Sequence, residues 1–108
     1  MDTPKGPIHS RFDDDPAYAD AIDAFIVRIA ERVDTLQDIE AGGDLAGLAV
    51  HVAALGGEAQ HLGYPLLAQS AGEVANAARE RNGELARKTL RELTDIARRV
   101  RQAHRGSL

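Results

Sequence analysis

The chain lacks cysteine and tryptophan altogether, and only 4% of its 108 residues are aromatic. Without cysteine, it has no disulfide, no thiolate zinc site and no cysteine nucleophile. Because aromatic side chains are scarce, the 44% of hydrophobic residues must build a core mainly from Leu, Ile, Val and Ala. That composition favours helices packed closely on small side chains over a β-sandwich or a barrel.

Long apolar runs and a coherent basic surface are absent as well. No apolar run approaches the roughly 18 residues of a membrane span, and the N-terminus lacks a hydrophobic signal core. We therefore expect a soluble, cytoplasmic protein. Residues 1–58 carry four basic and twelve acidic side chains, whereas residues 79–105 carry nine basic and four acidic ones. The acidic half argues against nucleic-acid binding, and we interpret the basic half as a solvated helix face.

Four stretches place apolar residues at the spacing of an amphipathic helix. They cover approximately residues 16–41, 44–62, 65–81 and 84–104. Glycine, proline and asparagine punctuate them, at Gly42-Gly43, at Gly63 and Pro65, and at Asn82-Gly83. Asp15 and Asp44 are suitable N-caps for the first two helices.

Connections this short make consecutive helices antiparallel neighbours. The sequence therefore predicts an all-α fold, an antiparallel up-down four-helix bundle that forms a single domain over residues 16–108. Residues 1–15 show no periodicity, and we expect a flexible N-terminal arm there. Ile8 and Phe12 are the residues of this arm that can pack onto the bundle.

The helix over residues 44–62 has an unusual outer face. One side carries the apolar stripe of Leu45, Leu48, Val52, Leu55, Ala59 and Leu62. The opposite side carries Ala46, Val50, Ala53 and Gly57, and no charged residue lies between Asp44 and Glu58. A helix that is apolar all round is normally buried. The outer face therefore predicts a docking surface for another protein, or a homodimer contact with a second copy of this chain.

Reactive groups are few, and we expect neither a metal nor a cofactor. His51 and His61 are separated by about 15 Å along a helix, too far to share a metal ion. Glu58 and His61 form a single Glu-x-x-His pair, whereas a di-metal site in a bundle needs two such pairs. No suitable partner lies close in sequence to any of the serines, Ser10, Ser70 and Ser107.

The stretch DPAYADAIDAFIVRIAERVDTLQDIEAGGDLAGLAVHVAALGGEAQHLGYPLLAQSAGEV resembles a histidine-containing phosphotransfer (HPt) domain of two-component phosphorelays. Those domains are four-helix bundles with an Asp-Pro helix start, an Ala-Gly-Asp turn and a helix of pattern L-x-x-x-A-H-x-L-K-G. A Leu-Gly break follows ten residues after the histidine. The resemblance covers about residues 14–104, and its most specific feature is the spacing of turn, helix, glycine and next helix.

An alignment without gaps matches Leu48, Val52, Leu55, Gly57 and Leu62-Gly63 to the family pattern. The phospho-accepting histidine of the family then falls on Ala53, and the assisting lysine falls on Gly56. Alanine has no lone pair that can attack a phosphoryl group, and glycine offers no cation. The resemblance thus implies an HPt-like module that docks a response-regulator receiver domain or a histidine kinase without accepting phosphate, and hence no enzyme.

Helix geometry supports this register. Ala53 lies about 130° from the centre of the apolar stripe, where it points to solvent, whereas His51 lies about 70° away. We therefore expect His51 to be a half-buried packing residue. A register shifted by two residues would make His51 the phosphoacceptor instead, and His61 lies about 12 Å further along the helix than Ala53.

The predicted docking surface consists of Ala46, Val50, Ala53, Gly56 and Gly57, with Gln60 and His61 at its rim. Three alternatives stay open at this point. The protein is an active phosphotransfer protein that uses His51, or a structural bundle that dimerises through the outer face of helix 44–62. An alanine substitution introduced at position 53 of an active HPt protein would also leave this sequence.

Overall fold

The computed structural model describes residues 6–106, and all regular structure in this range is helical. A short 3₁₀ turn, η1 (Pro16–Tyr18), leads into four helices, which are α1 (Ala19–Ala41), α2 (Leu45–His61), α3 (Pro65–Arg79) and α4 (Gly83–Gly106). The prediction of an all-α four-helix bundle is confirmed. Among the described helices, none is both long and apolar enough to cross a membrane.

Side-chain caps lie at three helix starts, but the cap predicted for the first long helix needs correction: Asp15 caps the 3₁₀ turn η1, whereas α1 begins at Ala19 and its N-cap, Tyr18, makes no side-chain hydrogen bond. The carboxylate of Asp15 accepts a hydrogen bond from the Ala17 N–H, and that of Asp44 accepts one from the Gly47 N–H, each at 2.9 Å. The Asn82 side-chain carbonyl likewise accepts from the Leu85 N–H at 3.1 Å. These bonds satisfy N–H groups that have no partner within the first turn of a helix.

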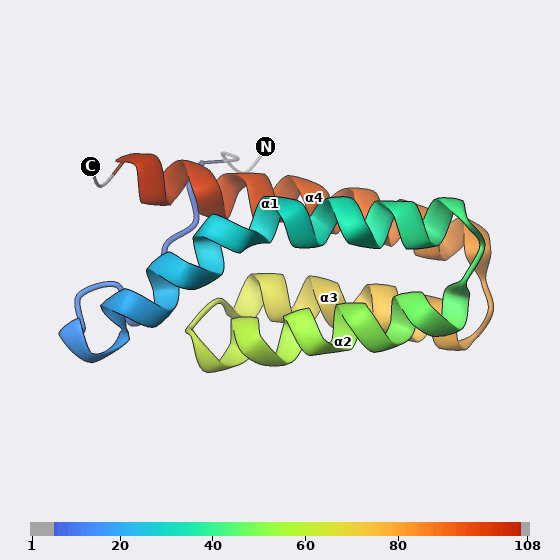
Figure 1. Ribbon diagram of the computed structural model, residues 1–108, viewed down its shortest axis with the longest axis horizontal. Coiled ribbons are helices and arrows are strands. Elements are labelled where there is room, and N and C mark those ends of the chain that lie inside the picture. Colours follow the sequence, from blue (N-terminus) through green and yellow to red (C-terminus); the bar gives the residue numbers. More distant parts are fainter. Residues whose placement is uncertain (1–5, 107–108) are drawn as a thin grey trace, which may run out of the picture.

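The helices form two pairs, with α1 beside α4 and α2 beside α3 (Figure 1). The α2–α3 pair is in close contact, because a Cβ atom added to Gly56 would lie 3.0 Å from the Ala71 Cβ. Polar side chains link α1 to α4, where the Gln37 amide donates to the Thr94 hydroxyl at 3.1 Å.

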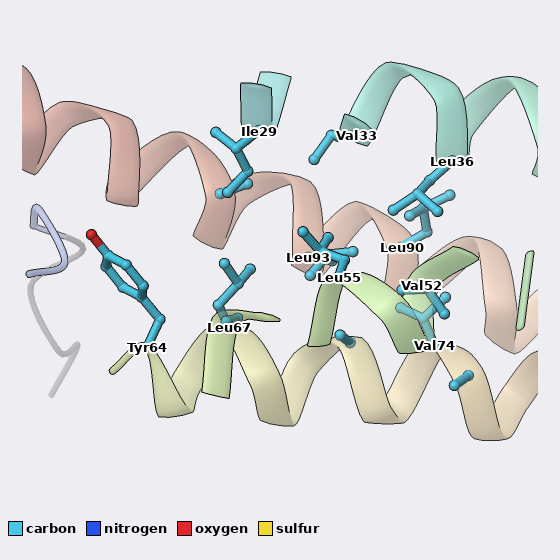
Figure 2. Close-up of a cluster of buried hydrophobic side chains, with 14 of the residues drawn as sticks. Ile29, Val33, Leu36, Val52, Leu55, Tyr64, Leu67, Val74, Leu90 and Leu93 are labelled. Atoms are coloured by element: carbon cyan, nitrogen blue, oxygen red, sulfur yellow. The ribbon is translucent and has the colours of Figure 1, made fainter. Parts of the chain in front are cut away.

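The core lies between the two helix pairs and is almost entirely aliphatic (Figure 2). All four helices contribute fully buried side chains to it, among them Ile29, Leu48, Val52, Leu55, Leu67, Val74, Leu93 and Val100. Tyr64 stands at one end of this cluster and stacks on Phe25, with 5.8 Å between the ring centroids. The inner stripe predicted for α2 is therefore the buried face of that helix.

The N-terminal segment differs from the flexible arm that the sequence predicts. Residues 1–5 of that arm lie outside the described range, but residues 6–15 are attached to the bundle. The Ser10 hydroxyl is buried and donates to the Leu62 carbonyl at 2.5 Å, and the Arg11 N–H donates to the Gly63 carbonyl at 2.8 Å. At the same end of the bundle, the Ile8 N–H donates to the Arg99 carbonyl of α4 at 3.0 Å.

Apolar contacts accompany these hydrogen bonds. Ile8 and Phe12 pack against the core, as their apolar character suggests, and Phe12 stacks on Tyr18 with ring centroids 4.4 Å apart. The expectation of a flexible arm therefore needs correction for residues 6–15. These contacts join residues far apart in the sequence, which a search for local periodicity does not detect.

Candidate functional site

The outer face of α2 is exposed and carries no charge over most of its length. Ala46, Val50, Ala53, Gly57 and Gln60 are all exposed, and Val50 keeps 69% of its surface accessible. They share one side of the helix because positions three and four apart lie above one another, whereas Leu48, Val52 and Leu55 face the core. This arrangement leaves an apolar row of small side chains at the surface.

Gly56 does not belong to that row, so its place in the predicted docking surface was wrong. It is buried at the α2–α3 contact, where an added Cβ would approach Ala71 to 3.0 Å and the Ala68 carbonyl to 3.6 Å. The physical reason is the helical angle, since position 56 points sideways toward α3. Any larger side chain at this position has to emerge from a closely packed helix contact.

Gly57, by contrast, is exposed, and nothing lies within 4 Å of a Cβ added there. Ala53, one turn before it, is exposed as well. These two positions carry no group that can act as a nucleophile, a base or a cation. Chemically, this part of the surface can exclude water from a contact, and it can do little else.

His51 is exposed, so the prediction of a half-buried packing residue was wrong. It lies on the side of α2 that faces α1, where a small cavity of about 120 Å³ opens between the two helices. Arg32 and Thr35 of α1 line the same cavity. The imidazole is exposed because α1 does not cover this side of α2.

His61 ends α2 and is exposed, with its ring 6.3 Å from the ring of Tyr18. Within residues 6–106, no three histidine, aspartate or glutamate side chains come close enough together to hold a metal ion. The Glu58–His61 pair therefore has no third ligand in the described part of the chain.

A larger groove, which the sequence does not predict, separates α1 from α2. Its volume is about 950 Å³, and its lining includes Ala21 and Ala24 of α1 and Glu58 and His61 of α2. Arg32 spans the groove and forms an ion pair with Glu58 at the surface. The available signal in the sequence was the pair of alanines on the side of α1 that faces α2.

Tyr64 is the titratable residue whose environment changes its chemistry most clearly. Only 2% of its surface is accessible, and it lies beneath the N-terminal segment. Burial raises the pKa of its phenol to about 12, and the negative charges of Asp13 and Asp23 act in the same direction. Because the phenol stays neutral at physiological pH, Tyr64 is a packing residue and no base.

No family model, curated protein or solved structure matches this chain. The HPt resemblance thus rests on the sequence pattern of residues 14–104.

Proposed function

We propose that this protein is a cytoplasmic HPt-like module of two-component signalling that docks a receiver domain or a histidine kinase without accepting phosphate. The observation that carries this proposal is Ala53, an exposed methyl group in the middle of an uncharged helix face. The HPt resemblance implies that a phospho-accepting histidine belongs at that position. A partner that docks here meets no group able to take its phosphoryl group.

The exposed face is suited to binding by close approach. Small side chains at Ala46, Ala53 and Gly57 let the backbone of a partner come near, and Val50 supplies a larger apolar anchor. Removal of this apolar surface from water favours association, and the absence of charge avoids the cost of desolvating an ion. The expected result is a docking protein that sequesters its partner or brings it to another protein.

A phosphotransfer assay with one restored side chain tests this proposal. Receiver domains are charged with a small-molecule phosphodonor and mixed with the natural chain or with Ala53→His. We expect receivers to bind both chains and phosphate to appear only on Ala53→His. Glycine 56 stays unchanged in this design, because a lysine there would disrupt the α2–α3 contact. Uptake of phosphate by the natural chain would contradict the proposal.

A second pair of variants locates the docking surface. Val50→Asp puts a charge into the exposed row and should weaken receiver binding at least about 10-fold. Gln102→Asp introduces the same charge at an exposed position of α4 and should leave binding unchanged. Sedimentation of the natural chain and of Val50→Asp tests the alternative that this face is a homodimer contact. A dimer that Val50→Asp breaks, in a chain that binds no receiver, would indicate a structural bundle.

The exposure of His51 favours a second candidate, an active phosphotransfer protein in the shifted register. The Arg32 guanidinium, which lines the same small cavity, is a cation that can stabilise a phosphoryl group on the imidazole. This candidate predicts acid-labile, base-stable phosphate on the natural chain, lost in His51→Ala and kept in His61→Ala. Retention of phosphate in His51→Ala would exclude this site.

A further inference from the structure

Helices α1 and α4 lie side by side, and their outer sides form one exposed face of the bundle, turned away from α2 and α3 (Figure 1). Three polar contacts between the two antiparallel helices define their alignment. They join Asp23 to His104, Gln37 to Thr94 and Glu40 to Arg87. By this alignment, Asp38 of α1 lies at about the level of Arg91 of α4.

The two helices carry opposite charges on this surface, which we call the α1–α4 face. Positions three and four apart share one side of a helix, so the exposed residues opposite the buried stripe form a row. The row on α1 consists of Asp20, Val27, Asp34 and Asp38, and the row on α4 consists of Glu84, Arg87, Arg91, Arg98 and Gln102. Carboxylates supply every charge of the first row, and arginines supply all but one charge of the second.

The remaining charges of the two helices lie elsewhere or are already paired. Arg28, Glu31 and Arg32 of α1 line the groove toward α2, and Glu92 of α4 lines a small cavity toward α3. Asp95 is half-buried and forms an ion pair with Arg98.

The central charges of the two rows are available to a partner. Within residues 6–106, the side chains of Asp34, Asp38 and Arg91 form no ion pair, although the two rows lie on neighbouring helices. Attraction inside one chain therefore does not use these groups.

A second copy of this chain fits the α1–α4 face by symmetry. In a dimer about a two-fold axis parallel to the helices, α1 of each copy lies over α4 of the other, and every residue keeps its level along the axis. Asp38 then faces Arg91 of the second copy, and Asp34 lies between Arg91 and Arg98 of that copy. A two-fold axis across the helices would instead bring the two acidic rows together, and like charges in a contact are repulsive.

The size of the face agrees with such a dimer. Helices of 23 and 24 residues are about 35 Å long, and a helix pair about 20 Å wide offers roughly 700 Å² per copy, close to the approximately 800 Å² of a standard interface. A nucleic acid or another polyanion is a poorer occupant, because the acidic row lies beside the arginines and repels it.

We infer that the α1–α4 face binds a second copy of this chain, with the acidic row of each copy on the basic row of the other. The outer face of α2 belongs to the other helix pair and stays free in this dimer. The inference therefore does not rest on the proposed docking of a receiver domain, and its test uses no receiver.

Charge reversal tests this pairing, because each single variant disrupts it and a mixture of two variants restores it. Asp38→Arg places two arginines against each other, and Arg91→Asp places two carboxylates against each other, so each variant alone should dimerise at least about 10-fold more weakly than the natural chain. An equimolar mixture of the two should form heterodimers with about the natural affinity, because both contacts again join opposite charges. Sedimentation measures each species, and the natural dimer should weaken at least about 5-fold when salt rises from roughly 0.05 to 0.5 M.

Two control variants distinguish this face from other contacts. Lys88 lies about 100° around α4 from Arg87, on the side away from α1, so Lys88→Asp should leave dimerisation unchanged. Val50→Asp on α2 should leave it unchanged as well, and thermal unfolding verifies the fold of every variant. A natural chain that stays monomeric up to about 0.5 mM at low salt would overturn the inference. A dimer that Val50→Asp breaks, or a mixture of folded Asp38→Arg and Arg91→Asp that stays monomeric, would overturn it too.

Discussion

Gly63 meets two requirements at a single residue. Its φ of +85° lies in the left-handed region, and an added Cβ would be 2.8 Å from both the Phe12 ring and the Ser10 hydroxyl. We expect Gly63→Ala to lower the free energy of unfolding by about 2–4 kcal/mol, through backbone strain of about 1 kcal/mol and displacement of the N-terminal segment. Urea denaturation measures this loss.

Gly43 provides the matched control for the Gly63 substitution. Its φ is +80°, but nothing lies within 4 Å of a Cβ added there. Gly43→Ala should therefore cost only the strain, about 1 kcal/mol. Equal losses in the two variants would show that the contact with the N-terminal segment contributes nothing.

Ser70 is a buried polar residue whose hydroxyl has no hydrogen-bond partner in the described part of the chain. Burial without a partner costs free energy, and alanine is also the better helix former. We expect Ser70→Ala to raise the stability by about 0.5–1 kcal/mol, measured by urea denaturation. A loss of stability would mean that the hydroxyl has a partner in solution, such as a bound water.

Because Tyr64 is buried, the stability of the fold should vary with pH in the alkaline range. The pKa of its phenol is about 12 in the folded protein, whereas an ordinary tyrosine has a pKa of 10.0. Between these two values, the folded protein retains a proton that the unfolded chain loses. The stability from this group is complete below pH 10 and declines as the pH rises from about 10 to 12, by up to about 2–3 kcal/mol. Comparison with Tyr64→Phe isolates this contribution, because the variant should lose that part of the decline.

At the scale of single elements, neighbouring glycines on α2 have opposite roles. Gly56 lies against Ala71, so Gly56→Leu should cost about 1–3 kcal/mol through overpacking of the α2–α3 contact. Gly57 faces open space, so Gly57→Ala should add about 0.5–1 kcal/mol, because alanine favours the helix. Thermal unfolding of both variants measures the contrast. A stabilising Gly56→Leu would show that α2 and α3 leave room for a larger side chain at their contact.

The helices were predictable from local signals, since Asp44 and Asn82 cap them and Pro65 opens one of them. The sides of α2 were predictable only in part. Ala53 is exposed, as its angle from the apolar stripe predicts, but the same angle estimate failed for His51 and did not detect that Gly56 is buried. An apolar stripe gives the direction of the core, whereas the distances to the two neighbouring helices decide which flank is covered. Here α3 is close to α2, and a groove separates α2 from α1.

At the scale of the whole molecule, the N-terminal segment joins parts of the chain that are distant in sequence. Ser10 bonds to Leu62 on the α2–α3 turn, and the Arg99 guanidinium of α4 donates to the Gly6 carbonyl at 2.9 Å. Nothing in the composition of residues 6–15 marks these partners, because each contact depends on where the bundle places its turn and its last helix. The segment therefore closes one end of the bundle over Tyr64.

A chain that begins at Asp14 tests the contribution of this closure. It lacks the packing of Ile8 and Phe12 and the Ser10 hydrogen bond, and we expect a loss of about 2–4 kcal/mol in urea denaturation. The full-length variant Ile8→Ser/Phe12→Ser keeps the backbone and should lose part of that amount. Because truncation also exposes Tyr64 and removes Asp13, the decline in stability between pH 10 and 12 should shrink as well. If the truncated chain retains both its stability and the decline of that stability between pH 10 and 12, the N-terminal segment contributes nothing to the fold, and the expectation of a flexible arm holds.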